Sequence, residues 1–319
     1  MPSEKMLIVS HAPFWHNGSS IQARTHGMLL AALPAVALGI VQYGLPALGV
    51  LALSVSSAML WEWMMNRFRK QRVTLADGNA AVLGLLLAML IPATTPWWAV
   101  LVGTLLTVVI GLHIFGGIGS NPFHPVVMAL MILTISWAQI FDFNAALVNY
   151  NFSFNALYPL GQIKNLGASA ADAYTYSDLL LGRQVGGIGS AFGLGLIAGG
   201  IYLMVKRYIR WEISLSFIAG LFLTAFIFHL ANPVRFADPL FHLLTGYTLI
   251  AAFFLLPEDS SSPVNRVPMF IYGAGAGVMT MLIRNIGAYA DGVLLAVLLM
   301  NLVGPLTDKI RPQALGKVA

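Results

Sequence analysis

The chain has 319 residues, of which 58% are hydrophobic and 9% are charged. Soluble domains carry roughly a quarter of charged residues, so this composition excludes a water-soluble globular protein and predicts an integral membrane protein. The net charge of +5 does not indicate a nucleic-acid partner, because the basic residues stand in short clusters between apolar runs. The absence of cysteine excludes disulfides and thiolate-held metal or iron–sulfur sites.

Ten apolar runs are long enough to span a lipid bilayer, since a span needs about 20 apolar residues and fewer inside a bundle. A polar stretch, residues 142–187, separates the fifth run from the sixth. The sequence therefore predicts an all-α integral membrane protein of about ten transmembrane helices. The ten predicted spans are residues 27–43, 46–66, 78–92, 96–114, 125–141, 188–205, 213–230, 239–256, 267–283 and 292–306.

The basic residues predict the orientation of these spans. Ten spans place both chain ends on one side, and with the N-terminus inside, 13 of the 17 Lys and Arg residues fall on the inner side. The positive-inside rule therefore predicts cytoplasmic N- and C-termini and an outer location for residues 142–187. The inner residues are Lys5, Arg24, Arg67, Arg69, Lys70, Arg72, Lys206, Arg207, Arg210, Arg266, Lys309, Arg311 and Lys317; the outer ones are Lys164, Arg183, Arg235 and Arg284.

The two halves of the chain resemble each other. The third span ends with LLLAMLIP at Pro92, and the eighth ends with IAAFFLLP at Pro257. Five spans per half is an odd number, so the two repeats must be inverted across the membrane, an arrangement that commonly places a ligand where the repeats meet. We expect a first five-helix repeat in residues 1–141, an outer loop region in residues 142–187 and a second five-helix repeat in residues 188–319.

The segment FGGIGSNPFHP, residues 115–125, is too rich in glycine and proline for a continuous helix. Non-helical backbone near the membrane is tolerated only when it is buried in protein or lines a cavity. Gly116, Gly117 and Gly119 allow a flat ring or a phosphate to approach the backbone closely, and Asn121 can hydrogen-bond the edge of a flavin. The alternative is a re-entrant turn that only connects two spans, and the sequence leaves both open.

Two further patterns have structural as well as functional interpretations. Asp77 and Asp291 each precede a glycine at the start of a span, so they are either helix caps or groups that handle ions in the membrane. The outer segment at residues 176–190 and the span after it are rich in glycine. Small residues let transmembrane helices pack closely, and we interpret these glycines in that way.

Taken together, these segments resemble the family of the D subunits of Rnf complexes and, more distantly, the B subunits of the sodium-translocating NADH:quinone oxidoreductase. The likeness runs nearly from end to end of the chain. It rests on SHAPFWHN at 10–17, ADGNAAVLGLLLAMLIPATTPWW at 76–98, FGGIGSNPFHP at 115–125, DLLLGRQVGGIGS at 178–190, IRWEISLSF at 209–217, FHLLTGYTLIAAFFLLPED at 241–259 and LIRNIGAYADGVLLAVLLMNLVGPLTD at 282–308.

The resemblance implies a ten-helix, inverted-repeat subunit of the bacterial inner membrane that works with other membrane subunits of an Rnf-like complex. Such a subunit passes electrons across the membrane through flavin, coupled to Na⁺ or H⁺ translocation. The family holds one FMN by a phosphoester to an outer threonine and a second flavin, FMN or riboflavin, inside the membrane. The chain shows no catalytic constellation of a self-contained enzyme, so an oxidoreductase activity would belong to the complex.

The outer attachment site departs from the family pattern. The family links FMN to a threonine in a motif such as S-A-A-T, and aligning Ser169 with that motif puts Asp172 at the threonine position. A phosphoester needs a hydroxyl, so Asp172 cannot form it, and Thr175 is the nearest candidate three residues later. We therefore expect covalent FMN to be absent or confined to Thr175. The alternative function is a flavin-poor paralogue that acts as a membrane transporter or as a structural scaffold of a larger complex.

Overall fold

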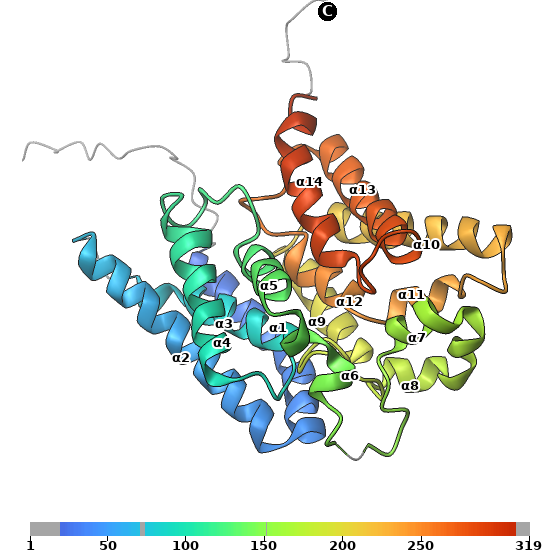
Figure 1. Cartoon of the computed structure of the whole chain (residues 1–319). Coiled ribbons are helices and arrows are strands. Elements are labelled where there is room, and N and C mark those ends of the chain that lie inside the picture. Colours follow the sequence, from blue (N-terminus) through green and yellow to red (C-terminus); the bar gives the residue numbers. More distant parts are fainter. Residues whose placement is uncertain (1–19, 71–73, 151, 311–319) are drawn as a thin grey trace, which may run out of the picture.

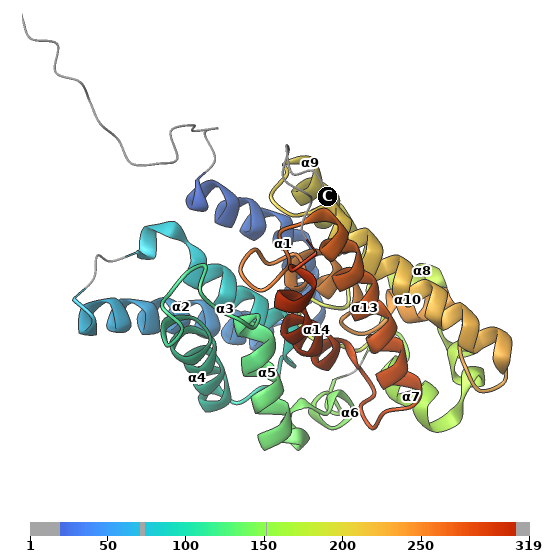
Figure 2. The same cartoon turned by 90° about the horizontal axis from the view of Figure 1, so that it is seen from above.

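The computed structural model describes residues 20–70, 74–150 and 152–310, and these residues form helices and connecting loops without any β-strand (Figures 1 and 2). The SHAPFWHN motif lies outside the described residues, as do Lys5, Arg72, Arg311 and Lys317 among the inner basic residues. The prediction of an all-helical chain is confirmed for the part of the protein that the structure covers. The number of spans and the inverted repeat remain predictions.

Four helices in the described part are long and apolar enough to cross a membrane: α1 (Ile21–Tyr43), α2 (Leu45–Phe68), α10 (Trp211–Ala231) and α13 (Arg266–Asn285). Five further apolar stretches are shorter. They are α3 (Asn79–Leu90), α4 (Trp97–Leu105) with its π-helical continuation η2 (Leu106–His113), α5 (Pro125–Ser136), α9 (Gly193–Val205) and α14 (Val293–Thr307).

The eighth predicted span, residues 239–256, is broken rather than continuous. It consists of α11 (Pro239–Leu244), a non-helical link, α12 (Thr248–Ile250) and the π-helical η5 (Ala251–Leu255). The link turns at Gly246, whose φ of 67° favours a residue without a side chain. A Cβ at this position would lie 2.3 Å from Oδ2 of Asp291. The helix is therefore broken where the side chain of Asp291 packs against the backbone of the link.

Two other span boundaries differ from the prediction. The sixth predicted span starts at residue 188, but helix α9 starts only at Gly193, because residues 188–190 form a turn that bonds to the end of α3. The N–H of Ile188 donates to the carbonyl of Ile91 at 3.2 Å. The fifth span ends at Ser136 instead of residue 141, where Trp137 leaves helical geometry and packs edge-on against Trp98.

Helix packing explains the glycine-rich spans. A Cβ on Gly199 of α9 would lie 2.2 Å from the carbonyl oxygen of Ala31 in α1, and a Cβ on Gly277 of α13 would lie 2.4 Å from the backbone of α10. In both pairs the helix backbones therefore lie in direct contact at the glycine, where any larger residue would clash. The predicted packing role of the glycines is confirmed at Gly199.

After η3 (Ala138–Phe141), short helices occupy the predicted outer region: α6 (Phe143–Ala146), α7 (Pro159–Leu166), η4 (Ala168–Ala173) and α8 (Tyr176–Leu180). Helices α6, α7 and α8 gather at one end of the molecule, whereas the C-terminal end of α14 lies at the opposite end (Figure 1). The chain thus separates residues 142–187 from the end of its last described helix.

An ion pair holds the broken span to the start of α14. The side chains of Arg284 and Asp291 are only 1% and 8% exposed, and their closest nitrogen and oxygen atoms are 2.9 Å apart. Arg284 also donates to the carbonyl oxygen of His242 at 2.8 Å and to the hydroxyl of Thr248 at 2.9 Å. The guanidinium therefore bonds backbone and side-chain oxygens on both sides of the break, where the helical ladder is interrupted.

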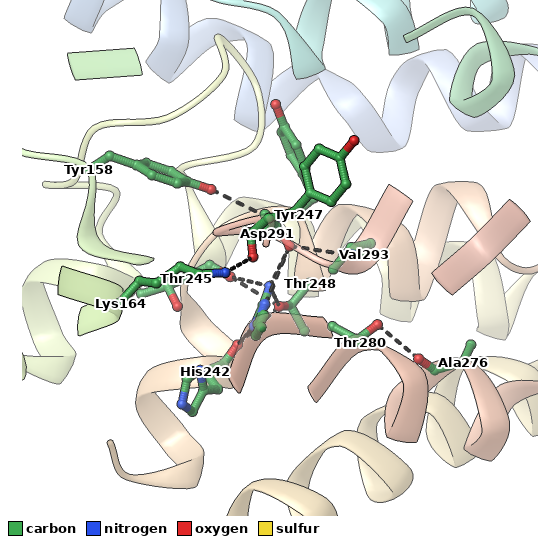
Figure 3. Close-up of polar contacts among 12 residues, drawn as sticks. Tyr158, Lys164, His242, Thr245, Tyr247, Thr248, Ala276, Thr280, Asp291 and Val293 are labelled. Atoms are coloured by element: carbon green, nitrogen blue, oxygen red, sulfur yellow. Dashed lines mark hydrogen bonds and ion pairs between the residues drawn. The ribbon is translucent and has the colours of Figure 1, made fainter. Parts of the chain in front are cut away.

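The carboxylate of Asp291 collects donors from three parts of the chain. It accepts from the N–H of Tyr247 at 2.7 Å and from the N–H of Val293 at 3.1 Å. The hydroxyl of Tyr158 points toward it from the outer region (Figure 3) and lies 3.4 Å away. The N-cap position of α14 belongs to Gly292, so Asp291 is not the predicted cap. It bonds the first N–H of the helix from one residue earlier and also neutralises Arg284.

Asp77 does not cap helix α3 either. The N-cap position belongs to Gly78, which has no side chain to bond the helix, and Asp77 instead ends the short helix η1 (Leu75–Asp77). Its backbone carbonyl accepts a hydrogen bond from the hydroxyl of Thr25 at 2.5 Å. The residue therefore connects η1 to α1 through its backbone.

The substitution Asp291→Asn should strongly destabilise the protein, because it leaves Arg284 buried without its counter-charge. Removing one partner of a buried ion pair typically costs about 3–5 kcal/mol, which denaturant-induced unfolding in detergent can measure. Asp172→Asn, at an exposed carboxylate, is the control and should unfold like the wild type. Equal stability of the two variants would contradict a structural role for the ion pair.

Candidate functional site

The predicted loop lines a cavity of about 240 Å³, here called the loop cavity. Residues 114–124 connect η2 to α5 and form part of its wall, and the segment after η5 forms another part. Apolar side chains and a few polar groups share the lining, as is common in small-molecule sites. The lining residues are Ile21, Arg24, Thr25, Met28, Asn79, Val82, Leu83, Leu86, Leu112, Ile118, Gly119, Asn121, His124, Pro125, Phe254, Glu258, Asp259 and Ser260.

The structure brings two of the four predicted loop residues to this cavity. Gly119 and Asn121 line it, whereas Gly116 and Gly117 do not. All three glycines have positive φ values, 118°, 106° and 90° in chain order, so each is required by the backbone path. A Cβ on Gly117 or Gly119 would meet no described atom within 4 Å. Of these two residues, only Gly119 lines the cavity.

Asn121 ties the loop to the segment that follows η5. Its Nδ2 donates to the carbonyl oxygen of Phe123 at 3.0 Å and to a carboxylate oxygen of Glu258 at 3.2 Å. The backbone carbonyl oxygen of Asn121 accepts from the hydroxyl of Ser260 at 3.0 Å. Both hydrogens of the amide group are therefore used inside the protein, so this side chain holds the loop in place and brings Glu258 to the cavity.

Charged residues that the sequence analysis did not single out also line the loop cavity. Arg24 of α1 forms an ion pair with Asp259, and the carboxylate of Glu258 accepts from the N–H and the hydroxyl of Ser261 at 2.9 and 2.5 Å. The sequence signal was the pair Glu258-Asp259 directly after the apolar run that ends at Pro257. A rim with both charge signs can orient a polar ring system.

His124 and Asn301 fix the loop to the second half of the chain. The N–H of His124, which is 1% exposed, donates to Oδ1 of Asn301 in α14 at 3.1 Å. The amide group of Asn301 donates in turn to the hydroxyl of Tyr272 at 2.7 Å and to the carbonyl oxygen of Ser261 at 3.1 Å. Helices α5, α13 and α14 therefore share one buried hydrogen-bond network beside the cavity.

Thr175 and Asp172 line a second, more open cleft of about 700 Å³ in the outer region, here called the outer cleft. Asp238 also lines it, and its carboxylate accepts from the hydroxyl of Tyr176 at 3.0 Å. Aromatic rings of Tyr174 and Phe241 form part of the wall. The cleft thus offers flat apolar surfaces next to two carboxylates.

Thr175 caps helix α8 and is exposed. Its hydroxyl donates to a carboxylate oxygen of Asp178 at 2.5 Å and accepts from the N–H of the same residue at 3.3 Å. The hydrogen bond from Thr175, helped by Arg183, lowers the pKa of the Asp178 carboxyl below its usual value. The hydroxyl predicted as the candidate for a phosphoester is therefore held beside a carboxylate.

The sequence profile of the NQR2, RnfD, RnfE family matches residues 8–316 of this chain. The match covers the loop cavity and the outer cleft together with all the helices described above. It agrees with the resemblance carried by the motifs.

Relatives similar over nearly their whole length carry closely related names. The chain is 33% identical to the D subunit of an ion-translocating oxidoreductase complex from Halorhodospira halophila, with 91% of this chain and 90% of the relative covered. It is 32% identical to the protein of the same name from Escherichia coli over 97% and 98% of the two chains. It is 30% identical to the D subunit of a proton-translocating ferredoxin:NAD(+) oxidoreductase complex from Clostridium ljungdahlii over 96% and 95%. The chain therefore belongs to the NQR2, RnfD, RnfE family.

Proposed function

We propose that this protein is the membrane-embedded D subunit of an Rnf-type electron transport complex. The observation that carries the proposal is the correspondence with relatives named as D subunits, which extends over more than nine-tenths of this chain. The long apolar helices fit a lipid environment. The function is electron transfer across the membrane coupled to Na⁺ or H⁺ translocation, carried out together with the other membrane subunits of the complex.

The protein resides in the bacterial inner membrane with its N- and C-termini in the cytoplasm. The distribution of Lys and Arg between the predicted inner and outer segments supports this orientation. The opposite placement of helices α6, α7 and α8 and the end of α14 is compatible with it (Figure 1). The loop cavity then opens toward the cytoplasmic half, and the outer cleft lies on the other side.

Reporter fusions test this orientation. Alkaline phosphatase should be active when fused after residue 160, and a cytoplasmic fluorescent reporter should be active when fused after residue 319, because the two positions lie on opposite sides. A fusion after residue 70, in a basic inner segment, is the control for the cytoplasmic side. Activity of the same reporter at residues 160 and 319 would contradict the ten-span arrangement.

A noncovalent flavin, FMN or riboflavin, occupies the loop cavity in this proposal. The apolar side chains of Met28, Leu83 and Phe254 would contact the ring faces, while Arg24 and Glu258 supply polar groups at the rim. The volume of about 240 Å³ is slightly below the usual range of small-molecule pockets, about 300–1,000 Å³, so in this proposal the cavity encloses only part of the flavin. The open space beside Gly119 allows the ring to approach the backbone.

A flavin in the loop cavity would shorten the distance that an electron has to cross in one step. The hydrocarbon core is roughly 30 Å thick, which is too far for fast electron transfer in one step. A flavin in the loop cavity would supply a carrier of one or two electrons between partners on the two sides. The protein itself contributes the shape of the site and the fixed charges of Arg24 and Asp259.

The loop glycines provide a matched pair of variants to test this cavity. Gly119→Leu adds a side chain at a position that lines the cavity, whereas Gly117→Leu imposes similar backbone strain at a position that does not line it. If the complex is extracted gently with its partners, we expect Gly119→Leu to lose flavin by about tenfold or more, since overpacking costs about 1–3 kcal/mol. Flavin released on denaturation and quantified by fluorescence gives the measurement.

The control outcome is retention of flavin in Gly117→Leu. Equal flavin content in wild type and Gly119→Leu would show that the loop cavity is not the site. A wild-type complex without any noncovalent flavin would favour the second candidate function, a flavin-poor paralogue that acts as a transporter or scaffold. The observation that favours this alternative is Asp172 at the expected attachment position.

The outer cleft is poorly suited to a covalently linked FMN. Asp172 and Asp238 line it, and Asp178 bonds the hydroxyl of Thr175 directly. A phosphate group carries up to two negative charges at neutral pH, so the carboxylate that bonds this hydroxyl and the two that line the cleft disfavour a phosphoester there. A covalent flavin is therefore absent or confined to Thr175.

Denaturing gels test the covalent link. We expect the wild-type chain to show no flavin fluorescence in the gel, because no family-type threonine is present and the hydroxyl of Thr175 bonds the carboxylate of Asp178. If a fluorescent band does appear, Thr175→Ala should abolish it, and Ser177→Ala, at a neighbouring hydroxyl, should not. Fluorescence that survives Thr175→Ala would place the attachment at another residue and contradict the prediction.

A further inference from the structure

A pocket of about 250 Å³, here called the cationic pocket, lies beside the outer cleft. Residues of α7, the loop after α10, α11 and the end of α13 form its walls. Three cationic side chains line it, and none of its described lining residues is an Asp or Glu. The lining consists of Leu160, Ile163, Lys164, Asn165, Gly167, Arg235, Phe236, His242, Arg284, Asn285 and Ala290.

The cations gathered here are most of those that the outer segments contain. The predicted outer segments hold four Lys or Arg residues, and Lys164, Arg235 and Arg284 line this one pocket. Basic residues are generally depleted from outer segments. These three residues come from distant parts of the sequence and line one pocket. This arrangement is better explained by a shared ligand than by three separate solvent-exposed charges.

Two of the three cations have no carboxylate partner in the described part of the chain. Lys164 donates from Nζ to the carbonyl oxygens of Gly287 and Tyr289, at 2.6 Å each. The guanidinium of Arg235 lies 5.3 Å from the centre of the Phe236 ring. Arg284 alone is neutralised, by Asp291, so the pocket keeps an excess of positive charge that favours an anion.

Unsatisfied polar groups also point to a missing ligand. His242 is 2% exposed, and neither of its ring nitrogens has a hydrogen-bond partner among the described residues. Nδ2 of Asn285 is likewise buried without a partner within the described structure. In Figure 3 the ring of His242 is directed away from Asp291, so the ion pair does not satisfy it. Buried polar groups almost always have a partner, and Asn285 needs an acceptor oxygen.

We propose that the cationic pocket binds a phosphate group. An ammonium, a guanidinium, an imidazole and a carboxamide approach it from different elements, and a tetrahedral anion with several oxygens can accept from all of them. Arginine is well matched to such oxygens because its N–H groups form a planar fork. The phosphate comes either from a free anion in the outer compartment or from the headgroup of a lipid at the outer membrane surface.

Binding to the purified complex in detergent tests the proposal with two probes. Equilibrium dialysis with radiolabelled inorganic phosphate tests the free anion, and native mass spectrometry with phosphatidylglycerol tests the lipid, with diacylglycerol of the same chains as the neutral comparison. We expect the wild type to bind one phosphate-bearing probe. The double variant Lys164→Gln/Arg235→Gln should bind it at least about tenfold more weakly, because two charge-assisted hydrogen bonds are lost.

The variants are chosen so that folding does not decide the result. Lys164 and Arg235 are exposed, and Arg67→Gln removes an exposed charge that lines none of the three cavities and should bind as the wild type does. His242→Phe should also weaken binding if the imidazole contacts the phosphate. Binding of neither probe, equal binding by the double variant, or equal binding of diacylglycerol would overturn the proposal.

Discussion

The buried pair of Arg284 and Asp291 stabilises the part of the fold that departs most from a simple helical bundle. Taking two charges out of water is costly, and their mutual attraction repays the cost only when further hydrogen bonds satisfy the remaining donors and acceptors. Here those bonds exist, because the break at residues 245–247 exposes backbone groups that the two side chains bind. The ion pair and the broken helix thus depend on each other.

Charge divides the surface formed by the predicted outer segments into two neighbouring environments. Asp172 and Asp238 line the outer cleft, whereas Lys164 and Arg235 line the adjacent cationic pocket. The boundary is narrow, since Gly167 belongs to one cavity and the next residue in the chain to the other. An anionic ligand would therefore be expected to prefer the cationic pocket over the outer cleft. The outer cleft, which carboxylates line, is better suited to a neutral or cationic group.

Local sequence patterns predicted the helices well and the contacts between them poorly. The expected spans at residues 46–66 and 267–283 fall within two residues of α2 and α13. The run from residue 239 to 256 is mostly apolar, and its break falls at Thr245 and Gly246, in the stretch that also holds His242 and Thr248. The glycine loop and Asn121 were recognisable as a candidate site, but its link to Glu258 joins residues 137 positions apart, and no periodicity or motif reports such a pairing.

The two π-helical turns have a consequence for how this architecture tolerates insertions and deletions. η2 ends just before the glycine loop, and η5 ends just before Glu258. Each π-helical segment is therefore followed directly by residues that line the loop cavity. A π-helical turn accommodates an additional residue within a helix, and each helical residue turns the chain by about 100°. Deleting one residue from either segment would restore α-helical geometry there. The lining residues that follow it would then rotate away from the opposite wall of the loop cavity. The length of these two turns is therefore as much a part of the cavity as the side chains that line it.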